Sequence, residues 1–198
     1  MKRFAMAAAC TALLLSSNSV WASSNEAIPG VRGIDHIGLT VPDIEQGVTF
    51  FQDVLGCAEV MRFGPFSDDK GTFMQDLVNV HPRAVIKQIA MMRCGDGSNL
   101  ELFQYSSPDQ KTEIPRNSDY GGVHIAFYVK DIQAAVDKAK ALGLKTFMGP
   151  FELKEGPAAG ESITYVLAPW GLQLELISYP NGMAYEKEAK TRLWAPEP

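Results

Sequence analysis

The sequence predicts an α+β protein built from two copies of one β-α-β-β-β module. The main observation is a repeat: residues 36–44 read HIGLTVPDI and residues 124–132 read HIAFYVKDI, matching without a gap at His, Ile, Val, Asp and Ile. Each copy leads into a helical pattern that stops at a glycine, and strand-like runs follow each helix. Self-similarity of this kind indicates a duplicated structural unit.

In each copy the aspartate of the repeat stands just before the expected helix, where its carboxylate can cap the first turn. Apolar residues of the first copy recur at helical spacing from Ile44 to Leu55, and Gly56 ends the pattern. The second copy runs from Ile132 to Leu142 and stops at Gly143 in the same way. We therefore expect one helix in each module, over closely equivalent residues.

Three strand-like runs follow each helix, over 58–63, 85–93 and 100–105 in the first copy and over 145–148, 163–168 and 172–178 in the second. Residues 95–98 and 169–171 have the composition of turns. The modules then span residues 33–106 and 121–179, and a polar linker over 107–120 joins them. Residues 64–83 form an insertion in the first module. Residues 180–198 form a polar tail, whose charges over 185–192 alternate as on a solvated helix.

The N-terminus has the pattern of a secretory signal peptide. Lys2 and Arg3 precede an almost entirely apolar run from Phe4 to Leu15, and small residues lead to Ala22. The apolar run is shorter than the roughly 20 residues that a transmembrane anchor needs. We therefore expect cleavage near Ala22, so that residues 1–22 are lost and the mature chain is periplasmic or secreted.

Three cysteines are too few for a disulfide scaffold. One of them, Cys10, lies within the apolar leader. In an exported chain Cys57 and Cys94 could oxidise to a disulfide. The favoured expectation is nevertheless two separate buried thiols, because cysteine often serves as a small core residue.

The composition excludes several kinds of partner. The formal net charge is −5, and the chain has no run of lysine and arginine. It therefore lacks the electrostatic features that bind nucleic acid or an anionic membrane surface. The expected partner is a small-molecule substrate.

Strand alternation gives four chemically reactive side chains a common orientation. His36 shares a face with Gly38 and Thr40, whereas Ile37 and Leu39 point the other way, toward the helix. The same reasoning separates His124 from the apolar residues beside it, and it turns Glu101 and Glu175 away from the leucines that flank them. All four side chains are expected on the concave faces of their sheets.

Two imidazoles and two carboxylates are a nitrogen and oxygen donor set that suits Zn, Ni, Co, Mn or Fe(II). A buried carboxylate on a strand is costly unless it is paired or bound to a cation. We therefore expect one divalent metal, held by His36, Glu101, His124 and Glu175. The alternative is two core histidines with two glutamates on a solvated face, but it leaves their equivalent positions in the repeat unexplained.

These motifs, HIGLTV at 36–41, ELF at 101–103, HIA at 124–126 and LEL at 174–176, resemble the vicinal oxygen chelate superfamily over residues 33–179. That superfamily includes glyoxalase I, methylmalonyl-CoA epimerase, extradiol dioxygenases and the fosfomycin- and bleomycin-resistance proteins. The resemblance implies two βαβββ modules that form a half-barrel around one divalent metal, and a homodimer. The His-Glu-His-Glu order is most similar to glyoxalase I.

By that resemblance Glu175 is the candidate base that moves the substrate proton, with Glu101 its counterpart across the metal. The expected reaction is that of a lyase or isomerase, either lactoylglutathione-lyase-like or epimerase-like. Bacterial glyoxalase I enzymes typically carry an arginine and an asparagine for glutathione where this chain has Thr40 and Tyr105. The alternatives are a resistance-type protein that sequesters a small molecule, and an extradiol dioxygenase.

A few further residues are candidates for the substrate pocket. Phe103, Tyr105 and Tyr128 share faces with the expected ligands, although aromatic residues there can equally belong to the core. Arg83 lies at the end of the insertion, where it could meet an anionic substrate or simply form a surface turn.

Overall fold

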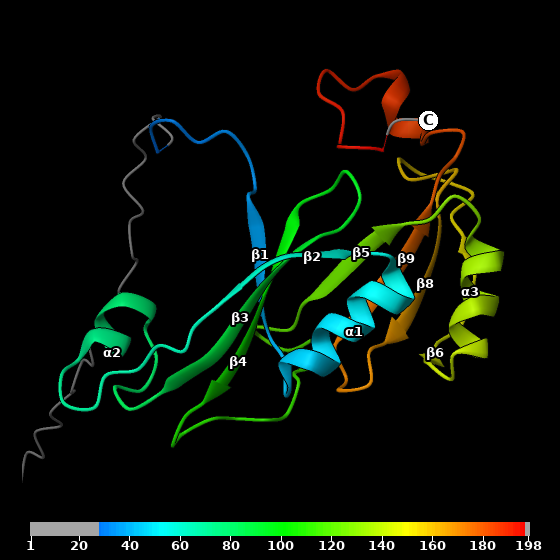
Figure 1. Cartoon of the computed structure of the whole chain (residues 1–198). Coiled ribbons are helices and arrows are strands. Elements are labelled where there is room, and N and C mark those ends of the chain that lie inside the picture. The colour runs from blue at the N-terminus through cyan, green and yellow to red at the C-terminus, as the bar shows by residue number, and fades with distance from the viewer. Residues whose placement is uncertain (1–27, 197–198) are drawn as a thin grey trace, which may run out of the picture. The chain divides into compact units, whose positions relative to one another are not determined.

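The computed structural model describes residues 28–196 (Figure 1). Residues 28–33 belong to an N-terminal unit, and a second compact unit begins at Ile34. The expected signal peptide therefore lies outside the described residues. No helix within 28–196 is long and apolar enough to cross a membrane.

The second unit contains two modules, in the α+β arrangement that the repeat predicts. The first consists of β1 (His36–Thr40), α1 (Ile44–Leu55), β2 (Ala58–Phe63), α2 (Phe73–Val78), β3 (Val85–Arg93) and β4 (Asn99–Ser106). The second consists of β5 (His124–Tyr128), α3 (Ile132–Ala141), β6 (Lys145–Thr146), β7 (Phe151–Glu152), β8 (Ser162–Leu167) and β9 (Gln173–Ser178), followed by the 3-10 turn η1 (Ala184–Lys187).

Both sheets follow the same path. The strand order is β1-β4-β3-β2 in the first sheet and β5-β9-β8-β6 in the second, where β7 also pairs with β8. In each sheet the first strand runs parallel to the last strand of its module, and the other pairs are antiparallel. The duplicated sequence therefore folds into duplicated topology.

The helices begin where their aspartates predict. Asp43 Oδ1 accepts a hydrogen bond from the Gln46 amide at 2.9 Å, and Asp131 Oδ1 accepts one from Ala134 at 3.0 Å. Gly56 ends α1 in the left-handed conformation, with φ of 70°, which a residue without Cβ adopts at little cost. The helix bounds are thus set locally, by side chains next to the helix ends.

One apolar core joins the two modules. Leu39 and Leu102 of the first sheet belong to the same buried cluster as Leu174 and Val166 of the second. Helix α1 links them, because Phe50 meets the Trp170 ring edge-on, with centroids 5.2 Å apart. Edge-on aromatic contacts of this kind add about 0.5–1.5 kcal/mol beyond area burial. The apolar faces of both sheets therefore pack into the same core.

The cysteine expectation is wrong: Cys57 and Cys94 form a disulfide. Cys57 follows the end of α1 and Cys94 follows the end of β3. Their neighbours Ala58 and Arg93 are a register pair of the antiparallel β2–β3 ladder, so the two cysteines come close, with Cα atoms 4.3 Å apart. Strand pairing, which sequence spacing does not specify, brings the thiols into bonding range.

The second module departs from the expected strand over 145–148. Strand β6 ends at Thr146, although the Phe147 amide still donates to the Tyr165 carbonyl of β8 at 2.9 Å. The separate strand β7 pairs further along β8. At Gly149 the chain passes so close to β8 that an added Cβ would lie 2.7 Å from Thr164 Oγ1. Pro150 follows and has no amide proton for the ladder. The close approach and the proline explain the break.

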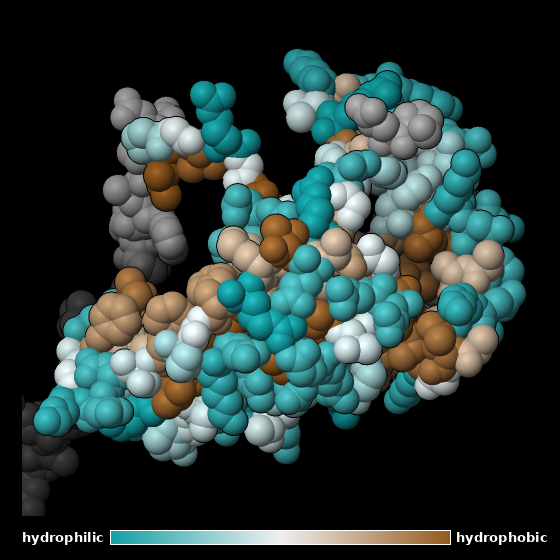
Figure 2. Space-filling view, in the orientation of Figure 1, coloured by the Kyte–Doolittle hydropathy of each residue, from teal (hydrophilic) through white to brown (hydrophobic). Residues whose placement is uncertain are grey.

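The insertion of the first module contains a helix that the sequence analysis did not predict. Met74 of α2 is buried against Ile86 and Ile89, on the face of the sheet opposite α1. The outer side of α2 exposes Phe73 and Leu77, and Figure 2 shows apolar side chains gathered over this helix. A helix of six residues is stable only through such packing. It is also too short to show a helical repeat of apolar residues in the sequence.

The tail is not the solvated helix expected over 185–192. Only the single turn η1 forms, and its backbone is tied to the loop before β8, because Ala184 and Tyr185 donate to the carbonyls of Ala159 and Pro157. Met183, just before the turn, is buried. Tertiary hydrogen bonds and one buried side chain thus replace the repeating helical bonds.

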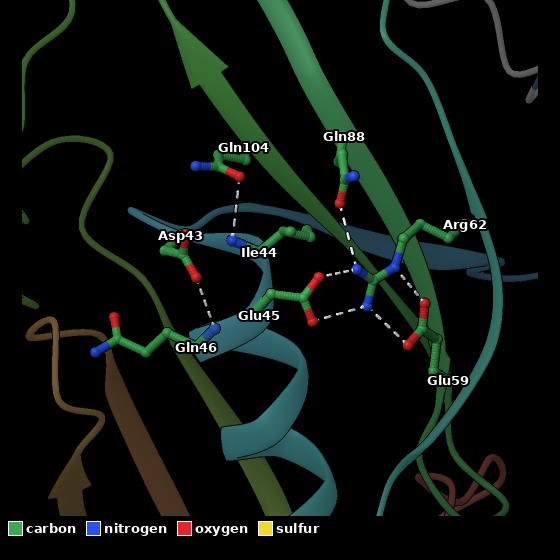
Figure 3. Close-up of polar contacts among 8 residues, drawn as sticks. All are labelled: Asp43, Ile44, Glu45, Gln46, Glu59, Arg62, Gln88 and Gln104. Carbon is green, nitrogen blue, oxygen red and sulfur yellow. Dashed lines mark hydrogen bonds and ion pairs between the residues drawn. The ribbon is translucent and has the colours of Figure 1, made fainter.

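An ion cluster attaches α1 to the first sheet (Figure 3). Arg62 of β2 donates to Glu59 of the same strand, through Nε at 2.6 Å and Nη2 at 2.9 Å. Its guanidinium also pairs with Glu45 in the first turn of α1 and reaches Gln88 on β3. The hydrogen bonds from Arg62 lower the pKa of Glu59, against the opposing effect of burial.

The disulfide is expected to contribute substantially to stability. It joins residues 37 apart, and closure of a loop of that length corresponds to about 4 kcal/mol. The Cys57→Ala/Cys94→Ala double variant should therefore lose roughly that much unfolding free energy in urea titrations under oxidising conditions. Under reducing conditions the two proteins should converge. Equal stability under oxidising conditions would contradict the assignment.

The Arg62 cluster predicts a pH-dependent loss of stability. A carboxyl whose folded pKa lies below its ordinary 4.5 stabilises the fold above that pH, and the contribution fades as the pH falls through the folded pKa. Arg62→Met should cost about 1–2 kcal/mol of unfolding free energy at pH 7 and less below pH 4. The control is Lys87→Met, an exposed change on β3. A pH-independent loss would show that packing, not charge, is responsible.

Candidate functional site

The structure brings the four expected metal ligands together as two matched pairs. His36 Nε2 lies 3.1 Å from Glu101 Oε2 in the first sheet, and His124 Nε2 lies 3.0 Å from Glu175 Oε2 in the second. Within residues 28–196, no three side chains among His, Cys, Asp and Glu gather as one metal-binding group. Each module therefore supplies half of the predicted ligand set.

Strand register explains why each pair forms. In the parallel ladder of β1 and β4, Gly38 is opposite Glu101, so His36 lies two residues along the same face. The second module repeats this arrangement, with Ala126 opposite Glu175. Gly38 and Ala126 are small, and they leave room beside each carboxylate. The sequence repeat therefore places a His–Glu pair at the same position of each module.

The carboxylates are more enclosed than the imidazoles. The side chains of Glu101 and Glu175 are 17% and 9% exposed, whereas those of His36 and His124 are 41% and 36% exposed. We call each His–Glu pair a half-site. In each half-site the histidine is the more exposed side chain and the glutamate the more buried one. A ligand that approaches from solvent meets imidazole nitrogen and carboxylate oxygen together.

Each histidine also has an oxygen partner on its other ring nitrogen. Asp35 Oδ1 lies 2.7 Å from His36 Nδ1, and Asn117 Oδ1 lies 3.1 Å from His124 Nδ1. The hydrogen bond to Asp35 raises the pKa of His36; burial opposes this, and the charge of Glu101 adds to it. Sequence reasoning missed both partners, although Asp35 directly precedes its histidine.

Two further residues that sequence reasoning missed lie beside Glu175. Tyr165 is opposite Glu175 in the β8–β9 ladder, and its ring meets His124 edge-on, with centroids 5.5 Å apart. Burial, and then the charge of Glu175 and a hydrogen bond to it, raise the pKa of Tyr165. Burial, and then the charge of Glu175, raise the pKa of Glu161. Strand alternation could have predicted both residues, because Glu161 and Tyr165 are at positions that share the face of Glu175 on the neighbouring strand.

The predicted pocket residues have different surroundings. Phe103 and Tyr105 stack with centroids 5.3 Å apart and pack against the cluster that holds Met74. Tyr128 meets Tyr179 edge-on at 4.9 Å. The Arg83 guanidinium donates to the carbonyls of Asp68 and Gly71, so it organises the insertion. Its contact with substrate stays a prediction.

An apolar hollow of about 290 Å³ lies next to the half-site of the second module. Two of its lining residues are register partners of the site residues: Tyr165 is opposite Glu175, and Gln173 is opposite His124. Its lining residues are Phe147, Met148, Phe151, Ile163, Thr164, Tyr165 and Gln173. The half-site thus has an adjoining space for the carbon skeleton of a small molecule.

Comparison with known proteins shows the family of this chain. Residues 35–165 match the family model described as Glyoxalase/Bleomycin resistance protein/Dioxygenase superfamily. The chain is 39% identical, over 88% of its length and 94% of the relative, to a 2-epi-5-epi-valiolone epimerase from an Actinomyces species.

Solved structures share the fold at low sequence identity. A glyoxalase family protein from Bacillus cereus is 18% identical with a TM-score of 0.58, and the match covers 77% of this chain and 98% of that one. A glyoxylase/bleomycin resistance protein/dioxygenase domain from Frankia sp. EAN1pec is 16% identical with a TM-score of 0.52, covering 75% and 98%.

The raised pKa of Glu161 predicts an effect of pH on the metal-free protein. A carboxyl whose folded pKa lies above its ordinary 4.5 leaves the fold most stable below that pH, and this stability is lost as the pH rises through the folded pKa. Glu161→Gln, which stays neutral, should therefore unfold at higher urea concentration than wild type at pH 7, with no gain at pH 4. The control is Glu155→Gln in the exposed loop nearby. A gain of equal size at both pH values would exclude the electrostatic cause.

Proposed function

The chain belongs to the glyoxalase/bleomycin resistance protein/dioxygenase superfamily, and from this membership we propose that it is a divalent-metal-dependent epimerase of a small oxygenated ketone. The observation that carries the proposal is the His–Glu pair at equivalent positions of both modules, His36 with Glu101 and His124 with Glu175. The name of the Actinomyces relative describes epimerisation of a ketone, and that reaction fits a site of this kind.

The donor chemistry of each His–Glu pair fits a divalent cation. Each pair directs an imidazole Nε2 and a carboxylate oxygen to one place, and mixed nitrogen and oxygen ligands suit Zn, Ni, Co, Mn or Fe(II). One ion held by His36, Glu101, His124 and Glu175 would require the two pairs to come together, because within residues 28–196 they do not form one group. When bound, it supplies a Lewis acid for adjacent substrate oxygens, so that negative charge developing next to the carbonyl is stabilised.

The protein's own residues then move the proton. Glu175, on the floor of its half-site, is the proposed base that takes the proton from the carbon beside the carbonyl. Glu101, on the other sheet, is the proposed group that returns a proton to the opposite face, which inverts the carbon. General acid–base catalysis of this kind contributes about 10²–10⁴ in rate. Tyr165, next to Glu175, would hold that carboxylate in place.

The residues at positions 40 and 105 favour epimerisation over a glutathione-dependent lyase reaction. Thr40 and Tyr105 occupy the positions where the resemblance to glyoxalase I implies an arginine and an asparagine. Tyr105 is stacked on Phe103, so an aromatic surface stands there instead of an amide. A substrate without a glutathione arm needs neither an arginine nor an asparagine at these two positions.

We also propose that the protein works outside the cytoplasm. The sequence pattern over residues 1–22 supports export, and so does the Cys57–Cys94 disulfide, since such bonds persist in oxidising compartments. The homodimer stays a prediction from the family resemblance.

Epimerisation in deuterated water tests the proposed function. Wild type loaded with Co²⁺ should bind about one ion per chain and place solvent deuterium on the inverted carbon of 2-epi-5-epi-valiolone, followed by NMR. Glu175→Gln and Glu101→Gln should each lower turnover by about 10²–10⁴. Glu155→Gln is the matched control and should keep wild-type turnover. Lack of a stoichiometric ion in wild type, or inversion without deuterium uptake, would refute the mechanism.

A further inference from the structure

The face of the second sheet that carries Glu175 continues beyond this residue to a second carboxylate. Tyr165 of β8 is opposite Glu175 of β9. Two residues earlier on β8, Ile163 is opposite Ile177. Glu161 stands a further two residues earlier, just before β8, so strand alternation gives its side chain the same orientation. This face therefore runs from Glu175, across two isoleucines, to Glu161.

The two isoleucines form a partly exposed apolar surface between the carboxylates. Ile163 and Ile177 are partly buried, whereas the next pair of the ladder, Thr164 and Leu176, lies on the other face and is buried. Ile163 also lines the apolar hollow of about 290 Å³, together with Phe151, its partner in the β7–β8 ladder. A small ring can therefore lie on an apolar surface with a carboxylate at each end.

The backbone of Glu161 is held on both sides, whereas its carboxylate has no hydrogen bond within residues 28–196. The amide donates to the Ala158 carbonyl at 3.1 Å, and the carbonyl accepts from the Leu153 amide at 2.8 Å. Burial, and then the charge of Glu175, raise the pKa of the carboxyl. A partly buried carboxylate without a partner is costly to the fold, and such costs are typical of groups that serve binding.

Gly160 fixes the direction in which Glu161 leaves the loop before β8. Gly160 has φ of 103°, and an added Cβ would lie 2.7 Å from the Gly182 carbonyl oxygen. Its amide donates to the Leu153 carbonyl at 3.0 Å. Because Gly182 belongs to the tail, close packing of the tail against this loop holds Glu161 at the end of the face.

The distance between the two carboxylates suits one small molecule. Glu161 and Tyr165, the partner of Glu175, are four residues apart, which corresponds to about 13 Å along a strand. The two glutamate side chains shorten this span. The charge of Glu175 contributes, after burial, to the raised pKa of Glu161, so the two groups are close enough to interact. The remaining gap is about the size of one substituted ring.

We propose that Glu161 is a substrate-binding residue that accepts hydrogen bonds from hydroxyl groups of a ring-shaped, polyhydroxylated ketone. An ionised carboxylate only accepts hydrogen bonds, so it selects donors such as hydroxyl groups. The C–H face of the ring lies on Ile163 and Ile177, and Glu161 turns the ring so that the carbon beside its carbonyl meets Glu175. This inference rests on the proposed epimerase function and specifies its substrate class.

A neutral polyol suits this surface better than a cationic ligand does. An ammonium group would also pair with the Glu161 carboxylate. Next to the two isoleucines, however, the charge would lose hydration that no other group there replaces. A ring with hydroxyl groups at its rim and C–H groups on its faces matches both parts of the surface.

Steady-state kinetics of Glu161→Gln test the inference. The amide keeps the shape of the side chain but replaces a charged acceptor by a neutral one. The KM for 2-epi-5-epi-valiolone should rise about 10-fold and kcat should stay within about 2-fold, because the contact is made to substrate and transition state alike. The matched control is Glu155→Gln in the same loop, which should change neither constant. A fall in kcat at unchanged KM would overturn the inference.

Direct binding gives a second readout that needs neither metal nor turnover. Metal-free protein with ¹³C-labelled tyrosine rings is titrated with myo-inositol, a ring polyol without a carbonyl group, and in parallel with cyclohexylamine, a ring that carries an ammonium group. Myo-inositol should shift the Tyr165 signal in wild type and in Glu155→Gln. Glu161→Gln should raise its dissociation constant about 10-fold. Cyclohexylamine should bind more weakly than myo-inositol.

The inference is wrong if wild type does not bind myo-inositol, if Glu161→Gln leaves that dissociation constant unchanged, or if cyclohexylamine binds more tightly than the polyol. Loss of folding would not explain weaker binding, because Glu161→Gln is expected to stabilise the protein at pH 7. Binding of myo-inositol that depends on Glu161, in a wild type without turnover, would refute the proposed epimerase reaction and support the hydroxyl-binding role.

Discussion

Neighbouring side chains of a β-strand point to opposite faces of its sheet, and the site of this protein depends on that constraint at four positions. Along β1 and β4 the leucines enter the shared core, while His36 and Glu101 turn to the other face. The parallel pairing of these two strands places the imidazole and the carboxylate within 3.1 Å. A shift of one residue in either strand would bury a charged group and expose a core leucine. The strand register that packs the core therefore also fixes the geometry of the site.

The two modules share this framework but surround it differently. The first is braced by the Cys57–Cys94 disulfide and by the Arg62 cluster. The second is braced by its tail and lines its half-site with Tyr165. The partners of the histidines differ in the same way, a carboxylate in one module and an amide in the other. Duplicated topology thus supports two unequal halves.

Much of the fold could be predicted because its signals are local. Asp43 and Gly56 bound α1 through hydrogen bonds within a few residues, and the repeat specified the equivalent helix and strands of the second module. The features that were missed depend on distant contacts. Helix α2 exists through the burial of Met74, and the break before β7 arises where Gly149 approaches Thr164. The periodicity of apolar residues along a single segment carries no information about such contacts.

For the site, the sequence by itself determined which four side chains face away from the core and that they recur in equivalent modules, because alternation and repetition are written in residue order. Tertiary structure alone decided which side chain meets which. It paired Cys57 with Cys94 through the β2–β3 register, set Tyr165 against Glu175, and brought Asn117 from the linker to His124. The physical reason is that strand pairing and chain reversal set distances between residues far apart in the sequence, whereas sequence patterns specify only local direction.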